Sequence, residues 1–315
     1  MLTLISLLSL LPAALSLPLS KTVAISNPQP KTVSNRAAGD PTPFSLTDAN
    51  STLLRPAQFA RVAYCSSASI TAWDCGGPCD ALKNITFLQS GGDQGKIPLY
   101  FIAHDAQDNS IVVAHEGTDA KNILSIVNDA EFGLVPLNVS RFPETAGKGI
   151  TVHDGFQQTF ERTADGLLAG VMAGIASTGA TKVVVTGHSL GAALATMTGA
   201  MIKDAVDPSV AVSVTGFGLP RGGNAAWADF LDSGVGVTYM SNQQDPVPTV
   251  PPQFLGFQHS SGEIHIVDDS GTNIVACPGQ DNEACSTGNS LLAASIPDHL
   301  GPYFDNITFG GSQCS

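Results

Sequence analysis

The feature that most constrains the fold is a short segment with two glycines around a serine, Gly187-His188-Ser189-Leu190-Gly191. It follows a β-branched run at 182–186 and opens an Ala-rich stretch at 190–205, which is typical of a helix packed closely on a sheet. A strand-to-helix turn this tight has no room for Cβ atoms beside the serine, so glycine is needed there. The pattern predicts a turn that raises the Ser189 hydroxyl as a nucleophile at the end of a sheet. The N–H of Leu190, at the start of the helix, would face a developing oxyanion with help from the helix dipole.

Other apolar, β-branched runs bounded by turn residues predict further strands, at 99–104, 110–115, 210–215, 237–240 and 263–267. Apolar residues recur at helical spacing over 156–178, which predicts a second helical stretch. Alternating strands and helices favour a mixed, mostly parallel sheet with helices on both faces. The composition agrees with a globular α/β chain, since 43% of the residues are hydrophobic and 13% are charged.

The first residues of the chain predict a secreted protein. Residues 2–16 are apolar and end in small residues, with Ala14 and Ser16 placed as at a signal-peptide cleavage site. This run is short and broken at Pro12, and no later stretch is long and apolar enough to span a bilayer. Residues 17–43 are rich in Pro, Ser, Thr and Asn without apolar periodicity. We therefore expect a signal peptide at 1–16, a loose arm or propeptide at 17–43, and one α/β domain at 44–315.

Cysteines and sequons also agree with secretion. Six cysteines are an even number and allow 15 pairings, and close spacing suggests Cys75–Cys79 and Cys277–Cys285, which leaves Cys65–Cys314. No Cys-x-x-Cys pair or partnering histidine cluster supports a metal site, so we expect no metal and no cofactor. Asn-x-Ser/Thr sequons predict N-glycosylation on surface loops at four positions, Asn50, Asn84, Asn138 and Asn306.

The charge of the chain argues against two classes of partner, nucleic acids and anionic membrane surfaces. The net charge is −13, from 14 basic and 27 acidic residues. Nucleic-acid binding needs a basic face, and electrostatic attachment to anionic membranes needs basic clusters. We therefore expect neither kind of partner.

A serine nucleophile needs a base and a carboxylate that orients the base. In hydrolases built on this strand–turn–helix, the acid and then the histidine follow the serine along the chain. Asp245 comes after the strand-like run that begins at 237, where a catalytic acid should lie, and prolines constrain the loop behind it. Asp268 and Asp269, past another strand, are the alternatives, although their surroundings have the composition of a solvated turn.

Three histidines follow the serine and are candidates for the base. His299 lies in an irregular segment near the C-terminus, and a loop suits a group that alternates between acid and base. His265 alternates with isoleucines on a predicted strand, and His259 lies in the turn before that strand. Spacing alone favours His299 only slightly.

Together these segments resemble the fungal class 3 lipases, which comprise secreted triacylglycerol lipases and their mono- and diacylglycerol lipase and feruloyl esterase relatives. The resemblance covers most of 60–315 and rests on the motifs VHDGF (152–156), VTGHSLGA (185–192), FGLPRGGN (217–224), DPVP (245–248) and DHL (298–300) with Tyr303. It implies an α/β-hydrolase fold, the triad Ser189, Asp245 and His299, and the three cysteine pairs suggested above.

The resemblance also implies two features of the segment after the strand at 110–115. Thr118, which follows Gly117, would be the first oxyanion-hole residue through its N–H, and its hydroxyl could contribute. The preceding His115-Glu116 departs from the family pattern, which leaves those side chains without a role carried over. A short helical lid would cover 119–132, where four residues form an apolar face at helical spacing, Ile123, Leu124, Ile126 and Val127. An ordinary surface helix would show the same pattern.

These features predict a secreted, monomeric carboxylic ester hydrolase that works through an acyl-enzyme. The expected substrates are acylglycerols at a lipid–water interface, with triacylglycerols ahead of mono- and diacylglycerols. The alternative is a feruloyl or other aryl or polysaccharide esterase with the same triad. An alternative of another class is a non-catalytic, glycosylated binding protein of this fold, which the presence of all three triad residue types in the right order makes less favoured.

Overall fold

A computed structural model describes residues 39–119, 122–123 and 132–314. The predicted signal peptide, the predicted arm up to residue 38 and most of the predicted lid lie outside these residues. Within the described ranges, no helix combines the length and the apolar character needed to cross a bilayer.

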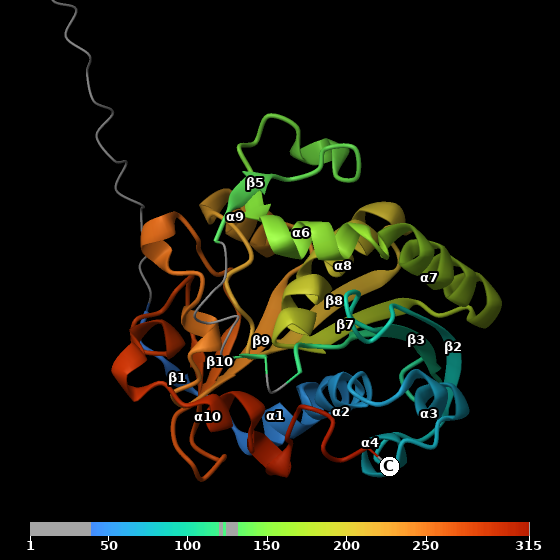
Figure 1. Ribbon diagram of the computed structural model, residues 1–315, viewed down its shortest axis with the longest axis horizontal. Coiled ribbons are helices and arrows are strands. Elements are labelled where there is room, and N and C mark those ends of the chain that lie inside the picture. The colour runs from blue at the N-terminus through green and yellow to red at the C-terminus, as the bar shows by residue number, and fades with distance from the viewer. Residues whose placement is uncertain (1–38, 120–121, 124–131, 315) are drawn as a thin grey trace, which may run out of the picture. The chain divides into compact units, whose positions relative to one another are not determined.

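Nine strands form one mixed sheet in the order β1-β11-β10-β9-β8-β7-β4-β3-β2 (Figure 1). Their bounds are β1 Thr42–Pro43, β2 Ile85–Gly91, β3 Tyr100–Asp105, β4 Ser110–His115, β7 Lys182–His188, β8 Ala211–Phe217, β9 Val237–Asn242, β10 Glu263–Ile266 and β11 Ile274–Cys277. The five central strands from β4 to β10 run parallel to their neighbours, while the strands at both edges pair antiparallel. A separate antiparallel pair joins β5 (Leu134–Pro136) to β6 (Thr151–His153).

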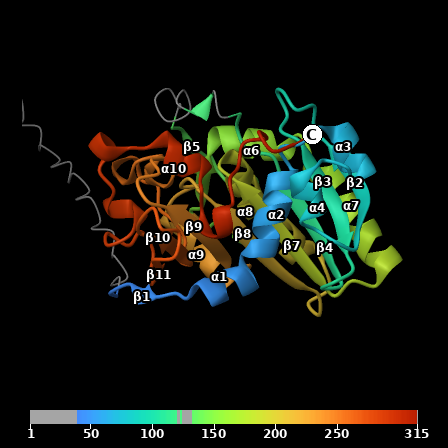
Figure 2. The ribbon, with the colours of Figure 1, turned by 90° about the horizontal axis from the view of Figure 1, so that it is seen from below.

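Helices cover both faces of the sheet. Their bounds are α1 Leu46–Thr52, α2 Leu54–Val62, α3 Ser67–Ala72, α4 Gly77–Asp80, α6 Asp154–Glu161, α7 Ala164–Thr178, α8 Leu190–Ala205, α9 Ala225–Ser233 and α10 Ile296–Leu300. Short 3-10 turns lie at Pro143–Thr145, Val247–Thr249, Gln253–Leu255, Ser286–Gly288, Leu291–Ala293 and Phe304–Asn306. One face carries α6, α7 and α8, and the other carries α1 and α2, as Figures 1 and 2 show from two directions. This is the α/β-hydrolase fold expected from the sequence.

The helix that follows Ser189 is the most deeply buried. Every residue of α8 from Gly191 to Ile202 is buried, because the helix packs on β7 and β8 below and on α6 above. Small side chains allow this close approach, and a Cβ on Gly199 would overlap the side chain of Val214 on β8. The small residues of α8 therefore allow close packing on the sheet, which fixes the position of the start of the helix beside Ser189.

The predicted helical stretch at 156–178 is two helices. The chain leaves helical geometry at Thr163, whose φ of −122° separates α6 from α7. The break redirects the chain, so that α6 lies along α8 while α7 covers β2 and β3. Periodicity alone does not detect it, because the apolar spacing continues on both sides.

The structure pairs the six cysteines as Cys65–Cys314, Cys75–Cys79 and Cys277–Cys285, the pairs that the spacing suggested. Cys65–Cys314 joins the end of α2 to the C-terminal segment, 249 residues away. Glu263 lies beside Cys277 and Cys285, but both sulfurs are used by the disulfide, so these residues do not offer a metal site.

The four sequon asparagines differ in their surroundings. Asn84 and Asn306 are exposed, while Asn50 and Asn138 are half-buried. The Asn138 side-chain amide donates to Glu161 Oε1 at 2.9 Å. Thr42 and Pro43, which the sequence analysis placed in the arm, form the edge strand β1 against β11.

Candidate active site

Ser189 stands on a strained turn between β7 and α8. Its φ of 59° and ψ of −128° are values that non-glycine residues rarely adopt, and such strain typically costs about 1–3 kcal/mol. A Cβ on Gly187 would collide with the backbone of Gly191, and one on Gly191 would collide with the carbonyl of His115. The turn is held from the neighbouring strand, since the Ser189 N–H donates to the Phe217 carbonyl at 2.9 Å.

Asp245 and His299 form a buried pair beside this turn. Asp245 follows β9, and its Oδ2 lies 2.8 Å from His299 Nδ1, while its Oδ1 accepts the Val247 N–H at 2.8 Å. Both side chains are fully buried. A carboxylate can only accept hydrogen bonds, so Nδ1 of His299 carries the proton that it donates to Asp245. In the neutral ring the lone pair is therefore on Nε2. Within the described residues, this buried Nε2 has no hydrogen-bond partner.

His299 is carried by the one-turn helix α10, where the sequence analysis expected an irregular segment. The Ser295 hydroxyl caps the helix by accepting the Asp298 N–H at 3.3 Å. Asp298 in turn accepts the Gln244 N–H at 3.0 Å, which fixes α10 to the loop that carries Asp245. The base is thus positioned from the same loop as the acid.

The alternative acids and bases have other surroundings. His259 Nε2 bonds to the Pro248 carbonyl at 2.8 Å, and His265 Nδ1 bonds to the Ser241 hydroxyl at 2.8 Å. Burial lowers the pKa of each of these histidines to about 4. Asp268 accepts from Ser270 and other residues of its own exposed turn, as the turn interpretation predicted.

Thr118 lies next to the serine turn because of the strand register. β4 and β7 are parallel neighbours in which His115 pairs with Gly187, so the residues just beyond both strands meet. The contact is close, since a Cβ on Gly117 would collide with the His188 carbonyl. Thr118 Oγ1 is buried and has no hydrogen-bond partner in the described ranges. The N–H of Leu190 is the first of α8 and has no intrahelical acceptor.

The two residues before Gly117, which depart from the family pattern, support this loop from below. His115 is buried and its Nε2 bonds to Thr198 Oγ1 at 2.9 Å, and burial lowers its pKa to about 3. Glu116 Oε2 accepts the Leu99 N–H at 2.7 Å, and burial raises the pKa of this carboxyl. Hydrogen bonds of both side chains therefore connect the segment before Gly117 to α8 and to the residue before β3.

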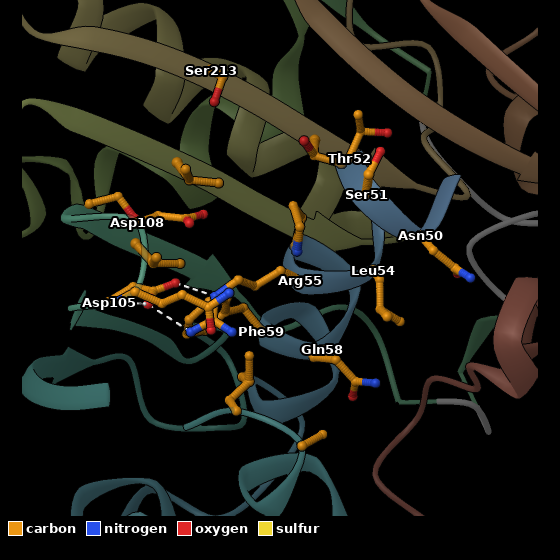
Figure 3. A pocket seen from close by; sticks show the side chains of 18 residues that line it. Asn50, Ser51, Thr52, Leu54, Arg55, Gln58, Phe59, Asp105, Asp108 and Ser213 are labelled. Carbon is orange, nitrogen blue, oxygen red and sulfur yellow. Dashed lines mark hydrogen bonds and ion pairs between the residues drawn. The ribbon is translucent and has the colours of Figure 1, made fainter. Parts of the chain in front are cut away.

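A pocket of about 480 Å³ lies elsewhere, between α1, α2 and the sheet face that they cover (Figure 3). Arg55 donates there to both carboxylate oxygens of Asp105, and to the Lys83 carbonyl at 3.2 Å. This ion pair ties the start of α2 to the end of β3. The lining of the pocket includes none of the three predicted triad residues, so we do not assign the chemistry to it.

The fold and the site geometry define a member of the α/β-hydrolase class. Residues 112–255 match the model of the class 3 lipase family. A secreted mono- and diacylglycerol lipase of Malassezia restricta is 34% identical over 226 residues, which cover 71% of this chain and 70% of that protein. Another from Malassezia globosa is 33% identical over 266 residues, 81% of this chain and 82% of that protein.

Solved structures give the same result. A Rhizomucor miehei lipase solved as a propeptide complex aligns with a TM-score of 0.74 and 25% identity over 86% of this chain and 84% of that one. A lipase of Rhizopus microsporus var. chinensis aligns with a TM-score of 0.74 and 26% identity over 87% of this chain and 93% of that one. This chain belongs to the class 3 lipase family.

Proposed function

We propose that this protein is a secreted acylglycerol lipase in which Ser189 is the nucleophile, His299 the base and Asp245 the residue that orients the base. The observation that carries the proposal is the pairing of a strained serine turn with a buried Asp–His pair whose outer ring nitrogen is unpartnered among the described residues. Strain and an unpartnered buried atom both cost stability, and such costs concentrate at functional sites.

The reaction follows from these positions. His299 Nε2 removes the Ser189 proton as Oγ attacks the ester carbonyl carbon, and Asp245 stabilises the imidazolium that forms. The tetrahedral intermediate collapses by breaking the bond to the alcohol oxygen, which takes the proton from His299. Water then attacks the acyl-Ser189 with His299 again as base, and the fatty acid leaves as Ser189 regains its proton.

The oxyanion of the intermediate would be held by the backbone N–H groups of Thr118 and Leu190. These groups come from the loop after β4 and from the start of α8, which lie close together, since a Cβ on Gly191 would collide with the carbonyls of His115 and Glu116. One such donor is typically worth about 3–4 kcal/mol of the barrier. The Thr118 hydroxyl, unpartnered within the described ranges, is a further candidate donor.

Exposed apolar side chains on segments that border the site favour a lipid substrate. Phe254 is 85% exposed and Leu255 is exposed beside it, in the loop that continues from Asp245. Leu292 is fully exposed, three residues before Ser295, whose N–H donates to the Gln244 carbonyl next to Asp245. Large apolar groups exposed in this way fit contact with a lipid surface.

Mono- and diacylglycerols are the preferred substrates in this proposal. The curated relatives that cover most of the chain at 33–34% identity are named as secreted mono- and diacylglycerol lipases. This revises the order expected from the sequence, which placed triacylglycerols first.

The test is the initial hydrolysis rate on emulsified tri-, di- and monoacylglycerol, a soluble short-chain ester and methyl ferulate. Ser189→Ala should abolish the activity on every substrate, while Ser233→Ala, at the exposed end of α9, should leave it unchanged. Diacylglycerol should be cleaved faster than triacylglycerol. Cleavage of methyl ferulate alone would refute the lipid proposal but keep the triad, and full activity in Ser189→Ala would refute the mechanism.

We propose that the mature protein is a glycosylated monomer that begins at Leu17 if residues 17–43 are a loose arm, or near Phe44 if they are a removed propeptide. N-terminal sequencing of the secreted protein tests the cleavage site, and light scattering tests the monomer. Glycosidase treatment with site mapping tests Asn50, Asn84, Asn138 and Asn306, of which the exposed Asn84 and Asn306 are the sites we expect to be filled most completely.

A further inference from the structure

A single phenol hydroxyl connects the oxyanion loop, the serine turn and the segment that carries His299. Tyr64 follows α2, and its Oη lies 2.6 Å from His188 Nδ1. The same hydroxyl lies against Gly117, where an added Cβ would overlap it. On its other side, His188 Nε2 lies 2.8 Å from the main-chain carbonyl of His299.

The His299 carbonyl determines the direction of both hydrogen bonds along the path from Tyr64 through His188 to His299. The His299 carbonyl can only accept, so His188 Nε2 carries the proton and Nδ1 has the lone pair. The Tyr64 hydroxyl therefore donates its hydrogen bond to His188 Nδ1. Every donor and acceptor along the path has one role, which selects one tautomer of His188.

The surroundings of His188 keep it neutral. It is fully buried and stacks on Phe309 with ring centroids 4.3 Å apart and planes 7° apart. The His299 ring lies 4.3 Å away on another side. Burial, and next the proximity of His299, hold the pKa of His188 well below its usual value. The imidazolium that forms on His299 during the reaction thus has an uncharged neighbour.

Tyr64 is itself held in place by the backbone. The next residue is Cys65, whose disulfide to Cys314 closes the C-terminal segment over the end of α2. The space next to Gly117 is filled by the Tyr64 hydroxyl, so a Cβ there would collide with it. The hydroxyl therefore has little freedom to leave its two neighbours, Gly117 and His188.

We propose that Tyr64 is a positioning residue for the ester hydrolysis proposed above, acting through His188. It sets the distance between the oxyanion loop at Gly117–Thr118 and the backbone of His299, with the serine turn between them. The inference rests on the proposed function, because positioning has a meaning only for a working triad. Tyr64 does not touch the reacting atoms in this account.

Loss of the hydroxyl should lower kcat and leave KM nearly unchanged. In Tyr64→Phe, His188 Nδ1 loses its donor and Gly117 loses the hydroxyl packed against it, so the His188 ring is held only by the bond from Nε2 to the His299 carbonyl. A displacement of about 1 Å in a catalytic group can reduce the rate by about a hundredfold, and we expect kcat to fall by about tenfold to a hundredfold. The acyl-binding surface is not altered, so KM should stay within about threefold.

The experiment compares Tyr64→Phe with Tyr239→Phe. Tyr239 is a fully buried tyrosine on β9 whose hydroxyl donates to the Ser260 carbonyl, so its variant also removes one buried hydroxyl. Each variant is assayed for kcat and KM on diacylglycerol and on a soluble ester, for the rate of Ser189 inactivation by an alkyl phosphonate, and for urea unfolding. We expect both to lose stability, but only Tyr64→Phe to lose kcat and the phosphonate rate together.

Two substitutions at His188 test which ring nitrogen donates the hydrogen bond to the His299 carbonyl. The amide nitrogen of His188→Gln can reach the position of Nε2 and donate to the His299 carbonyl, whereas His188→Asn reaches only the position of Nδ1. We expect His188→Gln to keep about ten times more kcat than His188→Asn, since it preserves the link to the base. Equal activity of the two, or the reverse order, would overturn the proposed path.

The outcomes separate this inference from the function on which it rests. If the wild type neither cleaves esters nor reacts with the phosphonate, the proposed function fails. If the wild type does both and Tyr64→Phe keeps kcat within twofold, only the positioning role of Tyr64 fails. A fall in kcat that matches the fraction unfolded, with the same fall in Tyr239→Phe, also overturns it, because it would show a structural role alone.

Discussion

A Cβ on Gly218 would stand 2.7 Å from His299 Cε1 and 3.0 Å from Asp245 Oδ2. The backbone there has a φ of +53°, in the region that favours glycine. Gly218→Ala should therefore push His299 away from Asp245 and Ser189, and we expect kcat to fall by about a hundredfold. Steady-state kinetics on a soluble ester measures this loss.

Gly236→Ala is the matched control for that substitution. Gly236 has a φ of +65°, and no atom lies within 4 Å of the place that an alanine methyl group would take, so alanine meets the same backbone strain without a collision. Gly236→Ala should lose about 1–2 kcal/mol of unfolding free energy and keep the wild-type kcat, whereas Gly218→Ala should lose more because of its collision with His299. A similar kcat loss in both would mean that strain, and not the position of His299, is responsible.

Thr118→Val should raise the stability of the fold and lower kcat. The Thr118 hydroxyl is buried and unpartnered among the described residues, so its removal should stabilise the fold by about 1 kcal/mol. If the hydroxyl donates to the oxyanion, kcat should fall by about a hundredfold, while Thr118→Ser retains most of it. A stabilised variant with unchanged kcat would restrict Thr118 to its backbone N–H.

Buried strands were easier to predict than edge strands. The six predicted runs correspond to β3, β4, β7, β8, β9 and β10, with ends shifted by up to two residues. Within the nine-stranded sheet, the strands that were not predicted are β1, β2 and β11, and all three lie towards its edges. The separate pair β5 and β6 was not predicted either. β2 contains Gln89, Ser90 and Gly91 and has no apolar alternation, because its pairing with β3 and not its own pattern makes it a strand.

Part of the candidate site can be predicted from short sequence patterns, and the rest depends on tertiary packing. The serine turn is local, since two glycines, a β-branched strand and a small-residue helix must be consecutive. The choice among His259, His265 and His299 is tertiary, and the resemblance decided it before the geometry placed His299 against Asp245. Tyr64 gave no signal, because its link to His188 spans 124 positions and appears only when α2 reaches the serine turn.

The three disulfides should contribute unequally to stability. Cys65–Cys314 closes a loop of 249 residues, whereas Cys75–Cys79 closes one of 4. By the chain-entropy relation, the first is worth about 5.5 kcal/mol and the second about 2 kcal/mol. Urea unfolding of the two paired Cys→Ala variants measures the difference. Equal losses would show that strain or residual structure, and not loop closure, sets the contribution.

Buried histidines should make the fold sensitive to acid. Burial lowers the pKa of His115 to about 3 and that of His259 and His265 to about 4. The unfolded chain binds these protons near the ordinary histidine pKa of 6.5, so stability present above that pH is lost as the pH falls toward 4. Each histidine should cost about 2 kcal/mol between pH 6.5 and pH 5.

His265→Asn isolates one of these contributions. Glu116 and Glu263 act in the opposite direction, because burial raises the pKa of both carboxyls and the folded state then retains their protons to higher pH. Both carboxyls remain in the variant, so the difference between variant and wild type reports on His265 together with its link to Glu263 through the Ser241 hydroxyl. We expect the variant to be less stable at pH 7, since the bond to Ser241 is changed, but to lose about 2 kcal/mol less on acidification from pH 6.5 to pH 5. Urea unfolding at both pH values gives this difference, and an unchanged dependence on pH would mean that His265 binds its proton in the folded state as readily as in the unfolded chain.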